Sequence, residues 1–160
     1  KKKIRKINPS IKIIIYKKKI SDKNINKILK GYNLIIDASD NFKTKFLLNR
    51  YSLKYRKSFI VGAISKFNGH IFNFDFTNKL SPCLKCFYET IPSDESLNCE
   101  TDGVIGSIGA IVGSVQACEA LKIMLNIGNK LKNSILRVDL LRLNFSLAKF
   151  SKKKRCICAK

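Results

Sequence analysis

The sequence lacks both a secretory signal and an uninterrupted membrane-spanning segment. It opens on a basic stretch, Lys1–Lys6, but no long apolar core of the kind found in signal peptides follows. The most membrane-like stretch, residues 106–125, is interrupted by Gln116, Glu119 and Lys122, which favours a buried helix over a membrane span. These absences predict a cytoplasmic protein with no membrane partner.

Acidic residues are scarce, since 11 Asp and Glu stand against 32 Lys and Arg, giving a net charge of +21. Such a balance is common among nucleic-acid-binding proteins. Here, however, the lysines are spread along the whole chain together with many Ile and Asn, and no segment interleaves basic residues with aromatic stacking platforms. We attribute the charge to a general drift in composition and expect no nucleic-acid partner.

The chain also lacks the G-x-G-x-x-G fingerprint of dinucleotide-binding domains and has only one histidine. Gly103, Gly106, Gly109 and Gly113 are three or four residues apart, which predicts one smooth helix face that another backbone can approach closely. His70 has no ligand partner nearby in the sequence, so we expect a structural or solvent-facing role.

What is present fits one soluble globular domain covering residues 1–160. The length of 160 residues allows a real core, and the hydrophobic fraction of 45% and charged fraction of 27% are ordinary. The chain begins with Lys rather than Met, so we expect residue 1 to be an internal position of a longer protein.

The hydrophobic pattern predicts an α/β fold. Apolar or β-branched runs predict strands, at residues 11–16, 34–36, 58–65, 70–76, 135–140 and 145–150. Helices are predicted through residue 7, at 21–29, at 42–56 and from 103 onward. The run at 34–36 is of the kind buried on both faces of a parallel sheet, and Asn68-Gly69 signals an antiparallel hairpin. The expected architecture is therefore a Rossmann-like mixed sheet, parallel strands turning antiparallel, with flanking helices.

The segment Asp37-Ala38-Ser39-Asp40-Asn41 separates a predicted strand from a predicted helix, which places it at the carboxyl edge of the sheet, where open α/β folds bind ligands. Two carboxylates and an amide are suitable ligands for a hydrated divalent cation that is also coordinated by a phosphate group. Alternatively, Asp40 or Asn41 simply caps the following helix. The residues alone leave both interpretations open.

The sequence holds six cysteines, four of them in two close pairs. Cys83 and Cys86 form C-x-x-C, Cys156 and Cys158 form C-x-C, and four thiolates so arranged suit a tetrahedral structural zinc site. A redox pair or four inert thiols are the alternatives. Cys118 is expected to be a small buried core residue.

Cys99 has no nearby cysteine partner. It lies in a polar loop just before the glycine-rich helix, where a thiolate would be stabilised. From its position alone, Cys99 is as well interpreted as a reactive thiol as it is as a cysteine without a chemical role.

Together these residues resemble a known family. Asp37-x-x-Asp40-Asn41-Phe42, then Thr44-Lys45 and Asn49, resembles the D-x-x-D-N-F-x-T-R…N segment of the ubiquitin-activating-type adenylyltransferases, the ThiF/MoeB/HesA family. Further matches follow in the family's order, at Gly62, Gly69, Pro82-Cys83-x-x-Cys86, Asn98-Cys99-x-Thr101-x-Gly103, Gln116-Ala117, Glu119 and the last two cysteines. Lys45 stands where the family has Arg.

The resemblance implies that the C-terminal glycine of a small ubiquitin-like sulfur-carrier protein is adenylated by ATP. In the family's pattern Asp40 would hold the Mg²⁺, Asn41 would lie in the nucleotide pocket, and the paired cysteines would be a structural zinc (Zn) knuckle. Cys99 would attack the adenylate or join a persulfide relay, with a sulfurtransferase or cysteine desulfurase as donor. The run Asn98-Cys99-x-Thr101 favours a thiamine-type over a molybdopterin-type carrier, and family members are usually homodimers.

The family's first strand, glycine-rich turn, ribose-binding acid and upstream ATP-binding Arg and Lys have no counterpart in the sequence. Without that backbone cradle for phosphates, the chain should be inactive by itself. It is then the C-terminal part of an adenylyltransferase domain: a fragment, one subunit of a split enzyme, or a degenerate remnant. The alternative function is a non-enzymatic module that binds the carrier protein without ATP activity.

Overall fold

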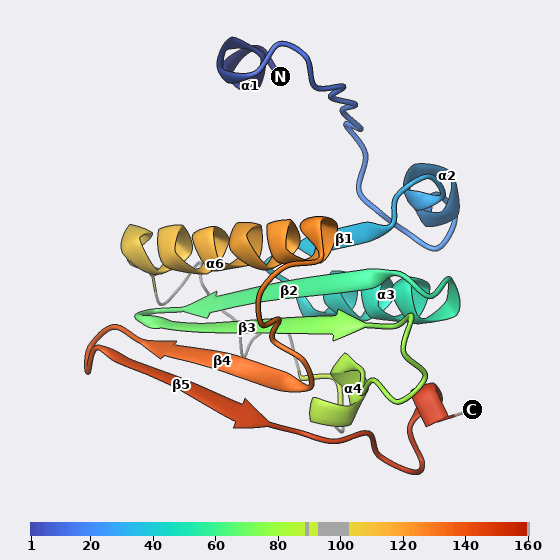
Figure 1. Ribbon diagram of the computed structural model, residues 1–160, viewed down its shortest axis with the longest axis vertical. Helices are drawn as coiled ribbons and strands as arrows, with labels where there is room; N and C mark the ends of the chain where they lie inside the picture. The colour runs from blue at the N-terminus through green and yellow to red at the C-terminus, as the bar shows by residue number, and fades with distance from the viewer. Residues whose placement is uncertain (89, 93–102, 160) are drawn as a thin grey trace.

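A computed structural model describes residues 1–88, 90–92 and 103–159 and shows one five-stranded sheet (Figure 1). The strands lie in the order β1-β2-β3-β4-β5, with bounds Leu34–Asp37, Ser58–Ser65, Asn68–Asp75, Ser134–Asp139 and Asn144–Lys149. β1 and β2 are parallel, and the three other neighbouring pairs are antiparallel. The predicted change from a parallel to an antiparallel sheet and the hairpin between β2 and β3 are confirmed, but Asn68 and Gly69 are the first residues of β3 rather than the turn, because Ser65 pairs with Asn68 and the turn lies at Lys66 and Phe67.

Helices cover both faces of this sheet (Figure 1). The long α6, Gly106–Leu125, lies on one face, where Ile60, Ile71 and Ile108 are fully buried. α3, Phe42–Lys54, lies on the other face over an aromatic layer of Phe59, Phe72, Phe74 and Phe76. The shorter helices are α1 (Lys2–Ile7), α2 (Ile25–Leu29), α4 (Leu84–Phe87) and the 3₁₀ turn η2 (Ile157–Ala159).

Two predictions about the N-terminal strands are wrong. Residues 11–16 form no strand, and Ile11, Ile14, Ile15 and Tyr16 are exposed on an extended segment that stands apart from the sheet with α1 (Figure 1). Their β-branched side chains favour a strand, but within the described residues no neighbouring strand pairs with them, and propensity alone does not form a ladder. The prediction that β1 is buried on both faces is wrong at Ile36, which is 48% exposed, although Ile35 packs in one core cluster and Leu34 against the other.

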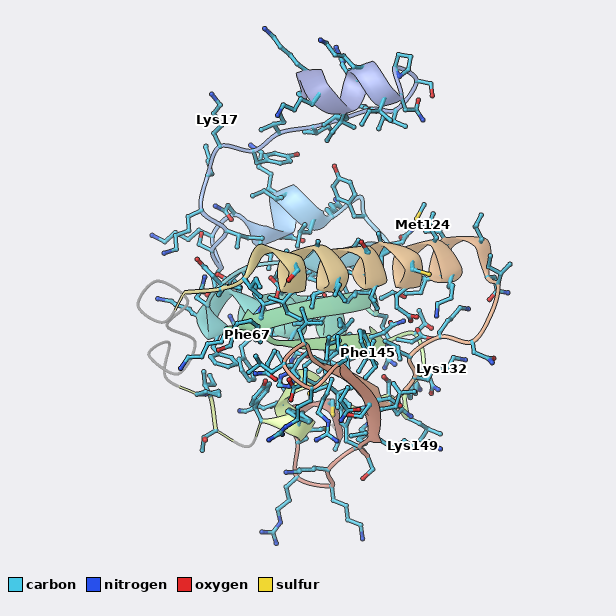
Figure 2. All side chains as sticks on the ribbon, turned by 90° about the vertical axis from the view of Figure 1, so that its left-hand side faces the viewer. Lys17, Phe67, Met124, Lys132, Phe145 and Lys149 are labelled. Atoms are coloured by element: carbon cyan, nitrogen blue, oxygen red, sulfur yellow. The ribbon has the colours of Figure 1, made fainter. Side chains whose placement is uncertain are left out.

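α6 is long and apolar enough to cross a bilayer by length and composition, and it is the one such helix among the described residues. The buried core helix of a soluble protein passes the same test, and α6 packs on β2 and β3. Its outer side carries Leu121, Leu125 and Met124, which is 72% exposed and points away from the sheet (Figure 2). Cys118 is exposed as well, so the expectation of a buried Cys118 is wrong.

His70 lies in β3 between Ala63 and Arg137, on its two neighbouring strands. It is partly buried, and this burial, together with the nearby Arg137 charge, lowers the pKa of His70 below its ordinary value. A neutral imidazole within the sheet fits the structural role expected for it.

A buried carboxylate fastens α6 to the rest of the domain. Glu119 is 2% exposed, and its Oε2 accepts hydrogen bonds from Asn73 Nδ2 at 2.8 Å and from the backbone N–H of Leu131 at 2.9 Å. Its Oε1 pairs with the ammonium of Lys122. One side chain thus joins the helix to β3 and to the loop that returns to β4.

We predict that Glu119→Ala lowers the free energy of unfolding by about 2–3 kcal/mol, because two donors lose their acceptor in a buried place. Urea denaturation measures the change. Asp22→Ala is the matched control: Asp22 pairs with Arg50 on the surface, and such pairs contribute only about 0–1 kcal/mol. Equal effects from both substitutions would contradict this assignment.

Candidate functional site

The loop between β1 and α3 lies at the carboxyl edge of the sheet, as predicted. Asn41 is the N-cap of α3, since its Oδ1 accepts the backbone N–H of Thr44 at 2.8 Å. The capping interpretation is therefore confirmed for Asn41. Its Nδ2 also donates to Asp40 Oδ1 at 3.0 Å, so the residue that begins the helix orients the neighbouring carboxylate too.

A buried ion pair holds this loop in place. Lys45 and Asp37 are each 2% exposed, and Lys45 Nζ lies 3.0 Å from Asp37 Oδ2. The same ammonium donates to the carbonyl oxygens of Ser39 at 2.6 Å and Gly62 at 2.7 Å. All three ammonium donors thus find acceptors, which is the condition under which a buried charge is tolerated.

The expectation that Asp37 and Asp40 act together as cation ligands does not fit this geometry. Asp37 Oδ2 accepts from Lys45, and Asp37 Oδ1 accepts from the backbone N–H of Ser39 at 3.0 Å. The carboxylate is inside the protein and engaged at both oxygens. Asp37 therefore shapes the loop, and Asp40 is the carboxylate that remains accessible.

α6 contributes a further contact that the sequence analysis did not assign. Gln116 is 4% exposed, and its Nε2 donates to the backbone carbonyl of Asp37 at 2.9 Å. The sequence signal for Lys45 and Gln116 was that each polar residue falls on the buried side of its helix pattern. The helix pattern does not predict which group Gln116 binds, because Gln116 and Asp37 are 79 residues apart in the sequence.

Asp40 lines a cavity of about 480 Å³ beside this loop. The other walls are Gly62–Ile64 of β2 and the side of α6 that carries Gly109, Val112, Gly113 and Gln116. The hydrogen bond from the Asn41 amide, helped by the Asp40 backbone and the Lys45 charge, lowers the pKa of Asp40 below its ordinary value. An ionised, solvent-accessible carboxylate beside a cavity can bind a hydrated divalent cation.

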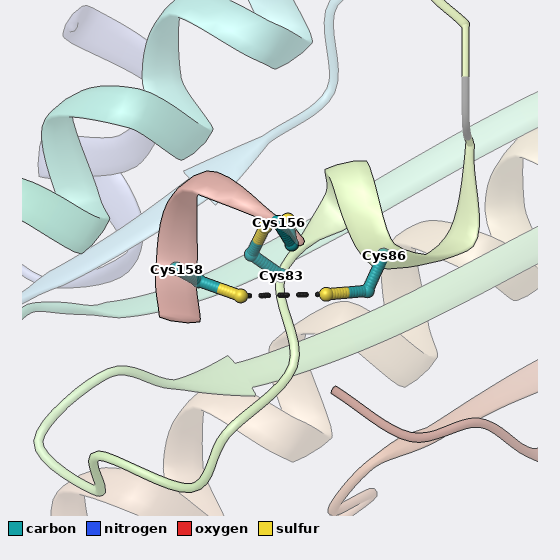
Figure 3. A group of neighbouring side chains, drawn as sticks. All are labelled: Cys83, Cys86, Cys156 and Cys158. Atoms are coloured by element: carbon teal, nitrogen blue, oxygen red, sulfur yellow. Dashed lines mark hydrogen bonds between the residues drawn. The ribbon is translucent and has the colours of Figure 1, made fainter. Parts of the chain in front are cut away.

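The four paired cysteines come together where α4 meets the C-terminal turn η2 (Figure 3). Cys83 and Cys86 flank the start of α4, and Cys156 and Cys158 lie at η2. All four sulfur atoms lie within 4.8 Å of one another, with Cys83–Cys156 at 3.5 Å and Cys86–Cys158 at 3.3 Å. Zinc–sulfur bonds of about 2.3 Å imply sulfur separations of about 3.8 Å in a tetrahedron, so the cluster could hold such a metal ion.

The electrostatics of this cluster are uneven. Burial, then the neighbouring Cys86 and Cys156, raises the pKa of Cys83 to about 12, and burial raises the pKa of Cys158 well above its ordinary value. Burial also opposes ionisation of Cys86, but backbone hydrogen bonds from Cys83 and Lys153 outweigh it and lower the pKa of Cys86. Cys86 therefore ionises more readily than Cys83 and Cys158, and a bound cation would favour the thiolate form of those two.

Hydrogen bonds position the two halves of the cluster. Asn49, 1% exposed on α3, accepts the backbone N–H of Leu84 at 3.0 Å through its Oδ1. Lys152 Nζ donates to the carbonyl of Lys79 at 2.7 Å, and the Lys153 amide lies 3.4 Å from Cys86 Sγ. The basic tail is thereby tied to the domain. Cys99 lies outside the described residues, so its reactive role stays a prediction.

We predict that Lys45→Met lowers the free energy of unfolding by about 3–5 kcal/mol, because it leaves the Asp37 carboxylate buried without a counter-charge. Urea denaturation tests this. Lys43→Met, an exposed lysine on the same helix, is the control and should change stability by no more than about 0.5 kcal/mol. A Lys45→Met protein as stable as the control would show that the pair does not hold the loop.

Comparison with known proteins supports the fold and reveals a difference in length. The chain is 33% identical over 159 residues to a sulfur carrier protein adenylyltransferase of Thermus thermophilus, a match that spans 97% of this chain and 59% of that protein. It is 37% identical over 148 residues to a probable molybdopterin-synthase adenylyltransferase of Pyropia yezoensis, spanning 91% of this chain and 39% of that one. The chain therefore spans about half the length, or less, of these curated relatives.

Solved structures show the same fold. The E. coli MccB structure with ATP superposes with a TM-score of 0.81 over 99% of this chain and 49% of that chain, at 11% identity. The sequence profile described as "ThiF family" matches residues 1–159, nearly the whole chain. The mixed sheet with its flanking helices, the cysteine cluster and this match agree: the chain belongs to the ThiF family.

Proposed function

We propose that this chain is the C-terminal part of an adenylyltransferase that activates the C-terminal glycine of a ubiquitin-like sulfur-carrier protein. The observation that carries the proposal is the accessible, readily ionised Asp40 on the wall of a cavity at the carboxyl edge of the sheet. The names of the relatives, adenylyltransferases of sulfur carriers and of molybdopterin synthase, support the same reaction class. A thiamine-type carrier is preferred because of Asn98-Cys99-x-Thr101, on resemblance alone.

In this reaction a carboxylate oxygen of the carrier's last glycine attacks the α-phosphorus of ATP. The bond between the α-phosphorus and the bridging oxygen breaks, and pyrophosphate leaves with the electron pair. Asp40 would hold the Mg²⁺ that accompanies ATP, and Asn41 would lie beside the nucleotide while keeping that carboxylate oriented. The Lys45–Asp37 pair would keep the loop rigid, so that no reorganisation is needed as phosphate charge develops.

The phosphate-binding part of the site would come from residues outside this chain. Within the described residues β1 pairs only with β2, so its outer edge is free to receive another strand. The greater length of the relatives supports such an addition. We expect the chain by itself to lack activity and the completed protein to show it.

A second candidate is a carrier-binding module without ATP chemistry. It is the alternative function that the sequence left open. ATP–pyrophosphate exchange separates the two candidates, because only an adenylyltransferase returns label from pyrophosphate to ATP.

Several further features belong to the same proposal. Cys99 would receive the activated carrier or join a persulfide relay, and the donor would be a sulfurtransferase or a cysteine desulfurase. A relative from Drosophila virilis, 31% identical over 134 residues, is named adenylyltransferase and sulfurtransferase MOCS3, which supports a sulfurtransferase partner. We also propose a cytoplasmic homodimer, in which the exposed apolar side of α6 is available for contact.

We propose that the cysteine cluster binds one structural zinc ion. Four sulfur atoms at suitable separations on two segments support this assignment over a redox pair, which needs only two. The metal would link α4 to the C-terminal turn.

Substitution of Asp40 tests the proposed cation ligand. In the full-length protein Asp40→Asn should slow ATP–pyrophosphate exchange roughly 100-fold or more, because the transition-state charge loses its anchored cation. Stability should be unchanged, since Asp40 is exposed. Asp22→Asn, which changes an exposed acid that pairs with Arg50 and does not line the cavity, should retain full exchange. Exchange at the wild-type rate in Asp40→Asn would refute the role of Asp40.

The zinc content of the protein tests the proposed metal site. Purified chain should contain one zinc ion per molecule by atomic absorption, and Cys86→Ser should abolish it and lower the unfolding temperature. Cys118→Ser, which removes an exposed thiol outside the cluster, is the matched control and should keep the zinc. Replacement by Co²⁺ should give the absorption bands of tetrahedral thiolate ligation. Zinc retained in Cys86→Ser, or none in the wild type, would refute the site.

A further inference from the structure

A second cavity, of about 480 Å³, lies at the end of α3 that is remote from Asp40. Its walls come from three segments that are distant in the sequence: the end of α3, the loop after β3, and the C-terminal tail with η2. The 13 residues of α3 span about 20 Å, and the two cavities share no lining residue. The second cavity is therefore a separate site, which the proposed function does not use.

The lining of this cavity is strongly basic. Four of its ten lining residues are basic and none is acidic, whereas the whole chain has 32 Lys and Arg among 160 residues, half that share. The four are Lys54, Arg56, Lys79 and Lys152. In the part of the chain that the structure describes, none of them forms an ion pair with a carboxylate. A cleft lined by charges of one sign concentrates ions of the opposite sign.

Hydrogen bonds hold the loop and the tail in place around the cavity. Asn78 Oδ1 accepts the backbone N–H of Leu80 at 2.9 Å, and the Asn78 carbonyl accepts the backbone N–H of Ser81 at 3.1 Å, so the turn that carries Lys79 is fixed. Lys152 Nζ donates to the Lys79 carbonyl at 2.7 Å, which joins the tail to this turn. The walls are thus ordered before any ligand binds, which reduces the entropy lost on binding.

The end of α3 opposes an anion only weakly. A helix C-terminus carries about half a negative elementary charge on its free carbonyl groups. Here the Leu53 carbonyl accepts the backbone N–H of Arg56 at 3.3 Å, and the Ser52 carbonyl accepts that of Lys57 at 2.9 Å. Four formal positive charges outweigh the remaining helix dipole. The net field in the cavity therefore favours anions.

The size and charge of the cavity indicate the class of anion. A volume of about 480 Å³ is typical of sites for small organic molecules, and Leu53 and Phe76 add apolar surface to the basic walls. Four positive charges balance about two phosphate groups, each of which carries about −1.5 to −2 at neutral pH. A concave site suits a compact anion better than a single-stranded nucleic acid, which binds along an extended basic groove with aromatic stacking platforms.

We propose that this cavity binds a small organic molecule that carries two or more phosphate groups. Arg56 would bind one phosphate group through two parallel N–H donors, because the guanidinium matches the spacing of phosphate oxygens. The three lysine ammonium groups would act as point charges toward the others. The apolar part of the ligand would contact Leu53 and Phe76.

The test is calorimetric titration of inorganic tripolyphosphate into the whole chain in a buffer without Mg²⁺. Arg56→Gly and Lys79→Gln should each weaken binding about tenfold, the loss expected for one charge-assisted contact. Arg56 has a φ of 52°, a conformation that glycine adopts without steric cost, so Arg56→Gly should unfold at the same or a higher urea concentration than the wild type. Weaker binding then reflects the lost guanidinium group and not a damaged fold.

The matched control is the double variant Lys43→Gln/Lys149→Gln, compared with Arg56→Gly/Lys79→Gln. Both double variants lose two positive charges, but Lys43 and Lys149 are exposed residues that do not line the cavity, so the control should bind like the wild type. Equal weakening in both would show attraction to the general positive charge and overturn the proposal. Wild-type binding in Arg56→Gly/Lys79→Gln, or no binding in the wild type, would overturn it as well. Tighter binding of a single-stranded RNA oligonucleotide than of tripolyphosphate, lost in the same variant, would assign the cavity to nucleic acid instead.

Discussion

The ammonium group of Lys45 is the interaction on which the candidate site depends. It binds a side chain at the end of β1, a carbonyl in the following loop and a carbonyl in β2, and so joins three pieces of backbone at one buried point. Gln116 connects α6 to the same place, because its amide donates to the backbone carbonyl of Asp37. A buried charge tolerates little displacement of its partners, because each lost hydrogen bond exposes it to an apolar surrounding. The loop that carries Asp40 is therefore rigid without any ligand, which is the condition for a preorganised phosphate site.

The cysteine cluster plays the corresponding role at the other end of the domain. Cys83 and Cys156 are 73 residues apart in the chain, and their sulfur atoms are 3.5 Å apart. Between them lie α6 and the β4–β5 hairpin, so the cluster closes a loop that contains half of the domain. Cross-links that close long loops restrict the unfolded chain most, and a metal bound here would stabilise the sheet and the basic tail together.

The N-terminal segment shows the limits of local pattern. Residues 11–16 have the composition of a strand and nevertheless stand apart, since a strand is stabilised by its neighbours and none of the described strands is beside it. Residues 58–65, with similar composition, form β2 because β1 and β3 pair with them on both sides. The same reasoning applies to Cys118, which was expected in the core because cysteine is a small residue that is usually buried, although it is exposed on α6.

The sequence by itself determined the class of fold, the change from a parallel to an antiparallel sheet, the position of the Asp40 loop, the pairing of the four cysteines and the family. These follow from local periodicity, turn residues and motif spacing, which act over a few residues. Only the tertiary structure decided that Asp37 is buried against Lys45 rather than available to a cation, that Gln116 reaches the same loop, and that two of the α6 glycines line a cavity. The physical reason is that burial and hydrogen-bond partnership depend on which distant segments meet, and no local pattern contains that information.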